Sequence, residues 1–175
     1  MSFTLSSSNV DAIFSGNQSD YAFSVSSSLP LSICLGSKCF KEGTIVKTEE
    51  GDKKIEDIKV GDRVLSKHPE TGEIAYKRVT KLYRNETSFW FTIFLSKKES
   101  ITCTLLHVFF LSNGEKRNAF TLKQTANLVD DKGKIHPIKY VKLIHHLRHY
   151  ETTYNIEVED FHTYFVSQSG VWVSN

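Results

Sequence analysis

The sequence predicts an all-β fold from Cys39 to its last residue. Short runs of β-branched and aromatic residues alternate there with turn residues about every ten positions, as they do in a sandwich or a barrel. Aromatic residues make up 12% of the chain, with twelve Phe and seven Tyr, and such side chains pack well on a pleated sheet. A length of 175 residues suffices for one compact domain with a short appendage, but not for two full-sized domains.

The individual strands follow from this alternation. Turns that contain Gly51 and Gly61 separate the first of them, because glycine permits the backbone angles of a tight turn. Only residues 121–128 could form a brief helix, and residues 130–134 form a polar turn. Strands or hairpin-sized segments are expected at residues 44–48, 53–58, 63–66, 74–82, 89–95, 100–104, 108–111, 138–144, 154–158, 164–167 and 171–173.

Residues 1–38 differ in amino-acid composition from the rest of the chain. Serine dominates this segment, charge is nearly absent, and the apolar residues follow no sustained period. We therefore expect residues 1–38 to be a mostly loose N-terminal flank, followed by one domain at residues 39–175.

Composition excludes several classes of partner. The formal net charge of +2 is too small to suggest nucleic acid or an acidic membrane surface. No apolar run approaches the length of a membrane span, and the sequence shows no signal peptide and indicates no compartment. Three cysteines are an odd number, so Cys34, Cys39 and Cys103 do not form a complete disulfide framework.

A cluster of histidines near residue 145 raises the question of a metal site. Neighbouring residues of a strand point to opposite faces, and no Cys or carboxylate completes a tight ligand set, so we expect no metal and no cofactor. The histidines concerned are His136, His145, His146 and His149.

Three blocks of sequence carry a family resemblance. They are CFKEGTIVKTEEGDKKIEDIKVGDRVLS, ITCTLLHVFFL and YNIEVEDFHTYFVSQSGVWVSN, in that order along the chain. Together they resemble Hint domains, the domains shared by inteins and hedgehog autoprocessing proteins, and are most similar to bacterial intein-like and pretoxin Hint domains. The resemblance covers residues 39–175. It implies an all-β, horseshoe-like fold with two halves related by a pseudo-twofold axis.

The resemblance also implies roles for residues of the first two blocks. Cys39 would attack the carbonyl of Lys38 and convert the Lys38–Cys39 amide into a thioester, which replaces one difficult step by two easier ones. His107 would donate a proton to the scissile nitrogen, and Thr104 would help to hold the amide. An imidazole, which titrates near pH 6.5, suits proton transfer. Without the resemblance, Cys39 would be interpreted as a buried structural thiol, as Cys103 still is.

In the closing block, the resemblance implies that Asp160 and His162 assist thiol activation and the final cleavage. Two residues that are two apart in a strand point the same way, so they could serve one site. The alternative is that Asp160, Phe161 and His162 form a solvated turn between strands. Asn175 would attack its own backbone carbonyl, close a succinimide and release whatever follows it.

Two departures from the family pattern limit this expectation. Inteins usually carry His before the final Asn, where this chain has Ser174, and a missing general acid costs roughly 10² to 10⁴ in rate. Splicing also needs a Cys, Ser or Thr directly after the Asn, and none is printed after Asn175. We therefore expect N-terminal cleavage at Cys39 and slow C-terminal cleavage, but no splicing from this sequence.

The resulting hypothesis is a single-turnover self-processing domain rather than an enzyme with multiple turnovers. Its substrate would be its own flanking polypeptide, and we expect it to be a monomer. Three alternatives stay open: a linker module between the carrier and the payload of a toxin, a hedgehog-like domain whose thioester is resolved by an external nucleophile, and a β-rich interaction module that has the fold without the chemistry.

Overall fold

The chain is built almost entirely of strands, as the sequence predicts. The computed structural model describes residues 10–13, 37–146 and 149–175. Within these ranges the helical elements are two single turns of 3₁₀ helix, η1 (Ile55–Asp57) and η2 (Ala119–Thr121). The all-β expectation is therefore confirmed.

Sixteen strands account for the rest of the regular structure in the described ranges. Their bounds are β1 (Val10–Ile13), β2 (Phe40–Lys41), β3 (Ile45–Thr48), β4 (Gly51–Lys54), β5 (Arg63–Lys67), β6 (Ile74–Thr87), β7 (Phe89–Phe94), β8 (Ser100–Cys103), β9 (Val108–Phe110), β10 (Lys116–Asn118), β11 (Asn127–Val129), β12 (Ile135–Pro137), β13 (Tyr140–His145), β14 (Glu151–Val158), β15 (Thr163–Val166) and β16 (Val171–Ser174).

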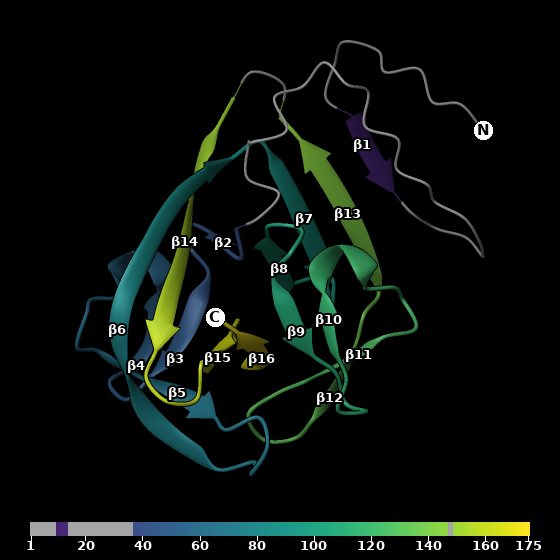
Figure 1. The fold of residues 1–175 in the computed structure, drawn as a ribbon. Coiled ribbons are helices and arrows are strands. Elements are labelled where there is room, and N and C mark those ends of the chain that lie inside the picture. Colours follow the sequence, from purple (N-terminus) through teal and green to yellow (C-terminus); the bar gives the residue numbers. More distant parts are fainter. Residues whose placement is uncertain (1–9, 14–36, 147–148) are drawn as a thin grey trace.

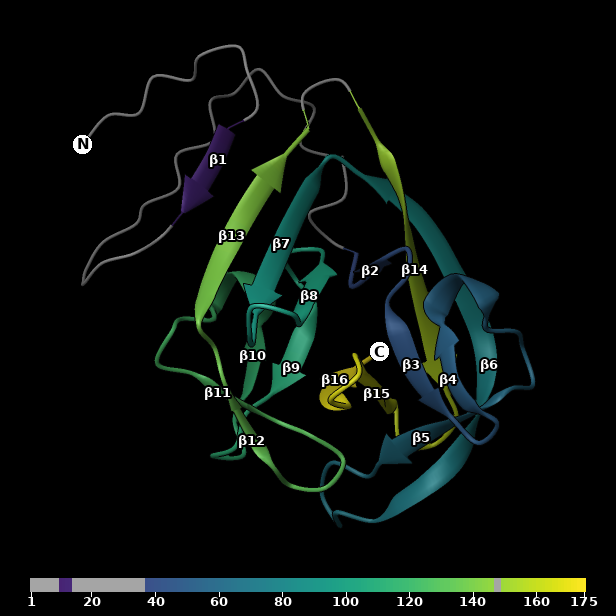
Figure 2. The same ribbon diagram turned by 180° about the vertical axis from the view of Figure 1, so that it is seen from behind.

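One continuous sheet of antiparallel pairs curls around the molecule. Its order is β1-β13-β7-β8-β2-β14-β6-β5-β3-β15-β16-β9-β10, with β4 on β3, while β11 and β12 form a separate ribbon. Figure 1 shows two arms, one with β14, β6 and β3 and the other with β7, β13 and β9, and the C-terminus lies between them. Figure 2 shows the same two arms from behind. The short strand β2 lies between β8 and β14, where residues far apart in sequence meet.

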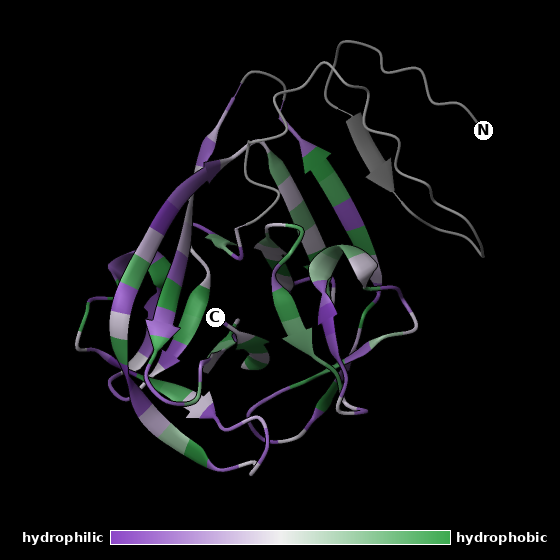
Figure 3. Cartoon of the chain, viewed as in Figure 1, coloured by the Kyte–Doolittle hydropathy of each residue, from purple (hydrophilic) through white to green (hydrophobic). Residues whose placement is uncertain are grey.

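The core runs along the inner faces of both arms. Its largest fully buried side chains come from strands of both arms and include Phe40, Trp90, Ile93, Phe109 and Tyr164. Hydrophobic and hydrophilic segments alternate along β6 and β13 in Figure 3. Such alternation is expected of strands with one buried face.

The expected brief helix at residues 121–128 is wrong. Helical backbone ends at Thr121, and residues 127–129 form strand β11, which pairs with β12. Leu128 is fully buried and bridges Leu111, so a tertiary contact overrides the local helix propensity of this segment.

Other differences concern strand ends. The segment expected at residues 53–58 ends as a strand at Lys54 and continues as η1. Strand β6 runs on to Thr87, and β14 begins at Glu151, because β14 pairs along its whole length with residues 79–87 of β6. The loose flank is expected at residues 1–38, but Val10–Ile13 forms strand β1 on β13; residues 1–9 and 14–36, with Cys34, lie outside the described residues.

None of the helices in the described part of the chain is long and apolar enough to cross a membrane.

The central position of Ile93 gives a test of the fold. Its side chain is 0% exposed, and its backbone pairs with Val141 and Ile101. We expect Ile93→Ala to lower the free energy of unfolding by about 2–5 kcal/mol, because it removes buried methyl groups and leaves a cavity. The matched control is Ile135→Ala on the exposed face of β12, which should cost less than about 0.5 kcal/mol. Urea unfolding followed by circular dichroism measures both, and equal costs would contradict the assigned core.

Candidate active site

Cys39 lies at the narrow junction between the two arms. It immediately precedes β2, in which Phe40 pairs with Cys103 of β8 and with Tyr154 of β14. Cys39 is only 1% exposed, although it lines a cavity. Phe40 is fully buried and acts as an anchor, so the backbone around Cys39 is held by packing as well as by hydrogen bonds.

Thr104 holds the backbone on both sides of the Lys38–Cys39 peptide bond. Its Oγ1 accepts a hydrogen bond from the amide of Cys39 at 2.9 Å and donates one to the carbonyl of Ser37 at 2.6 Å. The amide of Thr104 in turn donates to the carbonyl of Cys39 at 2.8 Å. These bonds are possible because Thr104 directly follows β8, whose Cys103 is the partner of Phe40.

His107 packs beside the same peptide bond in an apolar setting. Its side chain is 0% exposed, and its ring centroid lies 3.9 Å from that of Phe40. Burial lowers the pKa of His107 to about 3, and the interaction with the Lys38 backbone, which raises the pKa, is weaker. Neither ring nitrogen reaches a partner in normal hydrogen-bond geometry. The imidazole is therefore neutral at pH 7 and has unused donor and acceptor capacity next to the Lys38–Cys39 peptide bond.

A cavity of about 370 Å³ opens in front of the Cys39 thiol. Asn85 points its amide nitrogen toward Sγ, at 3.7 Å. Asn155 is oriented by two hydrogen bonds to its Oδ1, from the Tyr164 hydroxyl at 2.6 Å and from the Ile156 amide at 2.8 Å. The residues that line the cavity are Ser37, Lys38, Cys39, Tyr83, Asn85, Asn155, Glu157, His162 and Asn175.

Asn175 joins the cavity from the end of β16. Its backbone amide donates to the carbonyl of His162 at 3.1 Å. With the side-chain amide oriented to satisfy its neighbours, Nδ2 donates to the same carbonyl at 2.6 Å and Oδ1 accepts from the Val158 amide at 2.9 Å. His162 has a φ of 53°, a left-handed conformation that turns its carbonyl toward Asn175. The Ser174 hydroxyl donates to the backbone oxygen of Asn175 at 3.2 Å.

Asp160 does not reach this cavity. The expectation that it shares a strand face with His162 is wrong, because both residues lie in the turn between β14 and β15 and Asp160 has a φ of 60°. Its carboxylate pairs with Lys77 Nζ at 2.8 Å and its side chain is 61% exposed. It lines a neighbouring hollow of about 220 Å³, to which His162 also contributes. Of the six residues predicted for the site, the structure therefore gathers Cys39, Thr104, His107, His162 and Asn175.

The sequence reasoning missed five polar residues of the cavity, which are Ser37, Tyr83, Asn85, Asn155 and Glu157. The Tyr83 hydroxyl donates to Glu157 at 2.5 Å, and this bond raises the pKa of Tyr83. In the sheet, Asn155 is opposite Tyr83. A signal for β14 was available, because polar residues occupy every second position from 153 to 157 and so mark one face of the strand. Nothing comparable marks β6.

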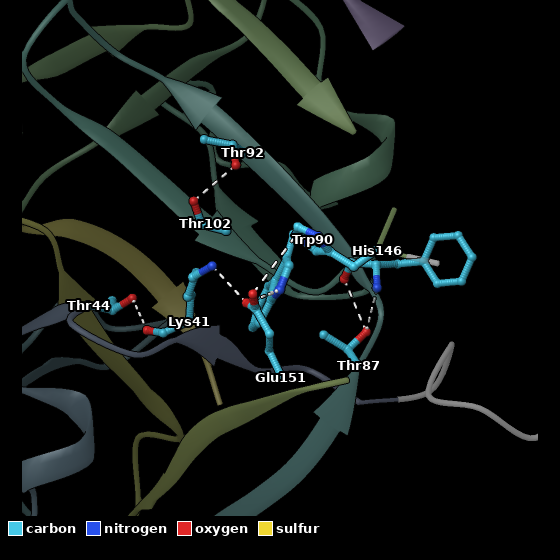
Figure 4. Close-up of polar contacts among 9 residues, drawn as sticks. Lys41, Thr44, Thr87, Trp90, Thr92, Thr102, His146 and Glu151 are labelled. Carbon is cyan, nitrogen blue, oxygen red and sulfur yellow. Dashed lines mark hydrogen bonds and ion pairs between the residues drawn. The ribbon is translucent and has the colours of Figure 1, made fainter. Parts of the chain in front are cut away.

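A second polar network holds β2 in place (Figure 4). Glu151 accepts hydrogen bonds from Lys41 Nζ and from Trp90 Nε1, both at 2.7 Å. The Thr44 hydroxyl donates to the carbonyl of Lys41 at 2.7 Å. These contacts tie β2 to β14 and β7, two residues after Cys39, and so limit how far the Lys38–Cys39 peptide bond can shift.

The described residues contain no group of three or more His, Cys, Asp and Glu side chains placed to hold a metal ion. The histidines near residue 145 have other contacts. His136 hydrogen-bonds Asp130 at 2.8 Å, and His145 stacks on Phe89 with ring centroids 4.0 Å apart.

Comparison with known proteins gives one consistent result. The sequence profile of the pretoxin HINT domain matches residues 45–175. A bacterial intein-like domain from Clostridium thermocellum is 34% identical and superposes with a TM-score of 0.74 over 79% of this chain and 99% of that one. No curated protein matches the sequence.

Two inteins share the fold at lower identity. The gp41-1 intein is 24% identical, with a TM-score of 0.63 over 78% of this chain and 98% of that one. A DnaB intein from Synechocystis sp. PCC 6803 is 12% identical, with a TM-score of 0.63 over 79% of this chain and 98% of that one.

The buried His107 predicts a pH dependence of stability. The folded chain protonates His107 only near pH 3, against 6.5 for the free side chain. Between these values the unfolded chain binds the additional proton, so His107 makes the free energy of unfolding fall as the pH falls, by at most about 1.4 kcal/mol per pH unit. We expect His107→Gln to remove this part of the slope.

Chemical denaturation of wild type and variant from pH 8 to pH 4 measures the difference. The imidazole carbon shifts of His107 should also stay constant in NMR spectra over this range. Titration of His107 near pH 6.5 would contradict the assigned environment.

Proposed function

The chain belongs to the pretoxin Hint family, and from that premise we propose that it cleaves its own backbone between Lys38 and Cys39. One observation carries the proposal. A single hydroxyl, that of Thr104, bonds the amide of Cys39 and the carbonyl of Ser37, so the bond between Lys38 and Cys39 is held from both sides. The thiol that would attack it faces a cavity with room for a reacting group.

The first step is an N–S acyl shift. The thiol of Cys39 loses its proton, and Sγ attacks the carbonyl carbon of Lys38 to give a tetrahedral oxyanion. Collapse of this intermediate breaks the C–N bond and leaves a thioester between Lys38 and the Cys39 side chain. The Cys39 nitrogen takes up a proton and becomes an amine, so the step needs no other reactant.

His107 would serve as the proton carrier in this step. A neutral imidazole can donate a hydrogen bond to the scissile peptide without a buried charge in the resting state. When negative charge develops on the oxyanion, protonation of His107 becomes more favourable, because opposite charges attract strongly in a buried site. The imidazolium then gives its proton readily to the more basic leaving nitrogen.

Asn175 would carry out a second, independent cleavage. Its Nδ2 attacks its own backbone carbonyl carbon, a succinimide closes, and the segment that follows leaves with a free amine. The Ser174 hydroxyl donates toward the backbone oxygen under attack. A hydroxyl polarises this oxygen but transfers no proton near neutral pH, so the second cleavage is slower than the first.

These steps define the proposed organisation of the chain. Residues 39–175 form the processing domain, residues 1–38 are the flank that the first cleavage releases, and the protein works once on its own polypeptide as a monomer without a cofactor. The alternative is an interaction module with impaired chemistry, which is favoured by Ser174 and by the pairing of Asp160 with Lys77.

The thioester gives a direct test. We expect the purified chain, treated with hydroxylamine or dithiothreitol at pH 7.5, to release residues 1–38 with the corresponding adduct, because these nucleophiles attack thioesters far faster than amides. Intact mass spectrometry detects both fragments. Cys39→Ala should abolish release, whereas Cys103→Ala, which removes a thiol outside the cavity, should release the flank as wild type does. Release from Cys39→Ala would show that scission does not proceed through this thiol.

The C-terminal cleavage is tested in a fusion with a reporter protein after Asn175. We expect Ser174→His to increase the rate of reporter release at least about tenfold, because it supplies a proton donor to the carbonyl of Asn175. Gel densitometry over time gives the rates, and Asn175→Ala provides the background. The assignment fails if the reporter leaves equally fast from Asn175→Ala.

A further inference from the structure

Asn85 is the nearest side-chain donor to the reacting sulfur. It lies near the end of β6, where it pairs with Thr153 of β14, and Thr153 pairs in turn with Lys41 of β2. The three strands are therefore neighbours, and the side chains of Asn85 and Cys39 meet over β14 with 3.7 Å between Nδ2 and Sγ. In the described part of the chain this is the one hydrogen bond that Sγ receives.

The direction of this contact matters chemically. An amide nitrogen can only donate, and a thiol sulfur is a weak acceptor, whereas a thiolate accepts hydrogen bonds strongly. The contact therefore stabilises the ionised form of Cys39 more than the neutral form. Because the thiolate is the nucleophile, the same contact raises the fraction of Cys39 that is ready to attack.

The charged and titratable groups around the sulfur form the setting of this contact. A neutral His107 lends the thiolate no positive charge. Lys41, two residues away, is bound to Glu151. The ionisable side chains nearest to the sulfur are Lys38, Tyr83, Glu157 and His162 on the cavity wall, together with the buried His107 and Tyr164. Tyr83 and Glu157 are bonded to each other, and Tyr164 donates to Asn155.

We propose that Asn85 is a catalytic residue of the N–S acyl shift. Its side-chain amide donates a hydrogen bond to the Cys39 thiolate and keeps this bond to the sulfur while the sulfur attacks the Lys38 carbonyl. The inference rests on the proposed cleavage at Cys39. Asn85 lies outside the three sequence blocks that resemble Hint domains. Asn85 is itself exposed at the rim of the cavity, so its removal leaves the buried core untouched.

Two measurements on the same variants test this role. The first is the pH dependence of Cys39 alkylation by iodoacetamide on uncleaved chain, resolved from Cys34 and Cys103 by peptide mass spectrometry. We expect half-maximal alkylation about one pH unit higher in Asn85→Ala, because a tenfold loss of thiolate corresponds to one pKa unit. Asn85→Asp should shift it further, because a carboxylate repels the thiolate. The second is release of residues 1–38 by hydroxylamine at pH 7.5, which should become about tenfold slower in Asn85→Ala.

Glu86→Ala is the matched control, since Glu86 is the next residue of β6 and points to the opposite face of the strand. It should match wild type in both measurements. Unchanged alkylation in Asn85→Ala and Asn85→Asp would overturn the contact, and a shifted alkylation with unchanged release would overturn the catalytic role. An equal effect of Glu86→Ala would assign the change to β6 as a whole and would also overturn the role. If wild type releases no flank, the proposed cleavage fails, but alkylation still reports on the Asn85–Cys39 contact by itself.

Discussion

The arrangement of this site depends on one threonine. Thr104 accepts from the amide that would become the leaving amine and donates to a carbonyl one residue further upstream, so its single hydroxyl spans the scissile bond. A net hydrogen bond contributes only about 1 kcal/mol to stability, so the value of this hydroxyl lies in geometry. It fixes the peptide at the end of β8, and all other groups of the site are placed relative to that fixed point.

Around the fixed peptide the protein keeps polar atoms that have no partner. Ser37 Oγ, Thr153 Oγ1 and both ring nitrogens of His107 are buried without a hydrogen bond in the described structure. Each such group costs about 1–3 kcal/mol, and native proteins contain few of them. Two further atoms of this kind, Ser167 Oγ and Trp172 Nε1, lie elsewhere in the described structure. In the proposed cleavage, the ring nitrogens of His107 would gain a partner as proton donor and acceptor. The buried packing of Phe40, Phe109 and Tyr164 offsets this cost.

The sequence predicted those parts of the site that depend on short-range patterns of residues. The strands that position Thr104, His107 and Asn175 follow from β-forming runs and turn residues, and the three blocks identify these residues and Cys39. Strand β2, which positions Cys39, was not among the expected strands. The pairing of β6 with β14 does not follow from such patterns, since it joins Asn85 to Thr153, 68 positions later by residue number. Asp160 was misplaced because a left-handed turn, and not strand alternation, sets its direction. The helix expected at residues 121–128 and the expected end of strand β6 were both wrong for one reason. In each case a partner distant in sequence determines the conformation.

The left-handed turn at His162 also helps to explain why Asn175 lines the same cavity as Cys39. Its carbonyl accepts from the backbone and from the side chain of Asn175. The bond from the Val158 amide holds the other end of that side chain, so Asn175 cannot rotate freely. An ordinary strand at this position would direct the carbonyl into a sheet ladder and leave the amide of Asn175 without this anchor. At a conformational cost of the order of 1 kcal/mol, one left-handed residue thus places the second proposed nucleophile in the cavity that Cys39 also lines.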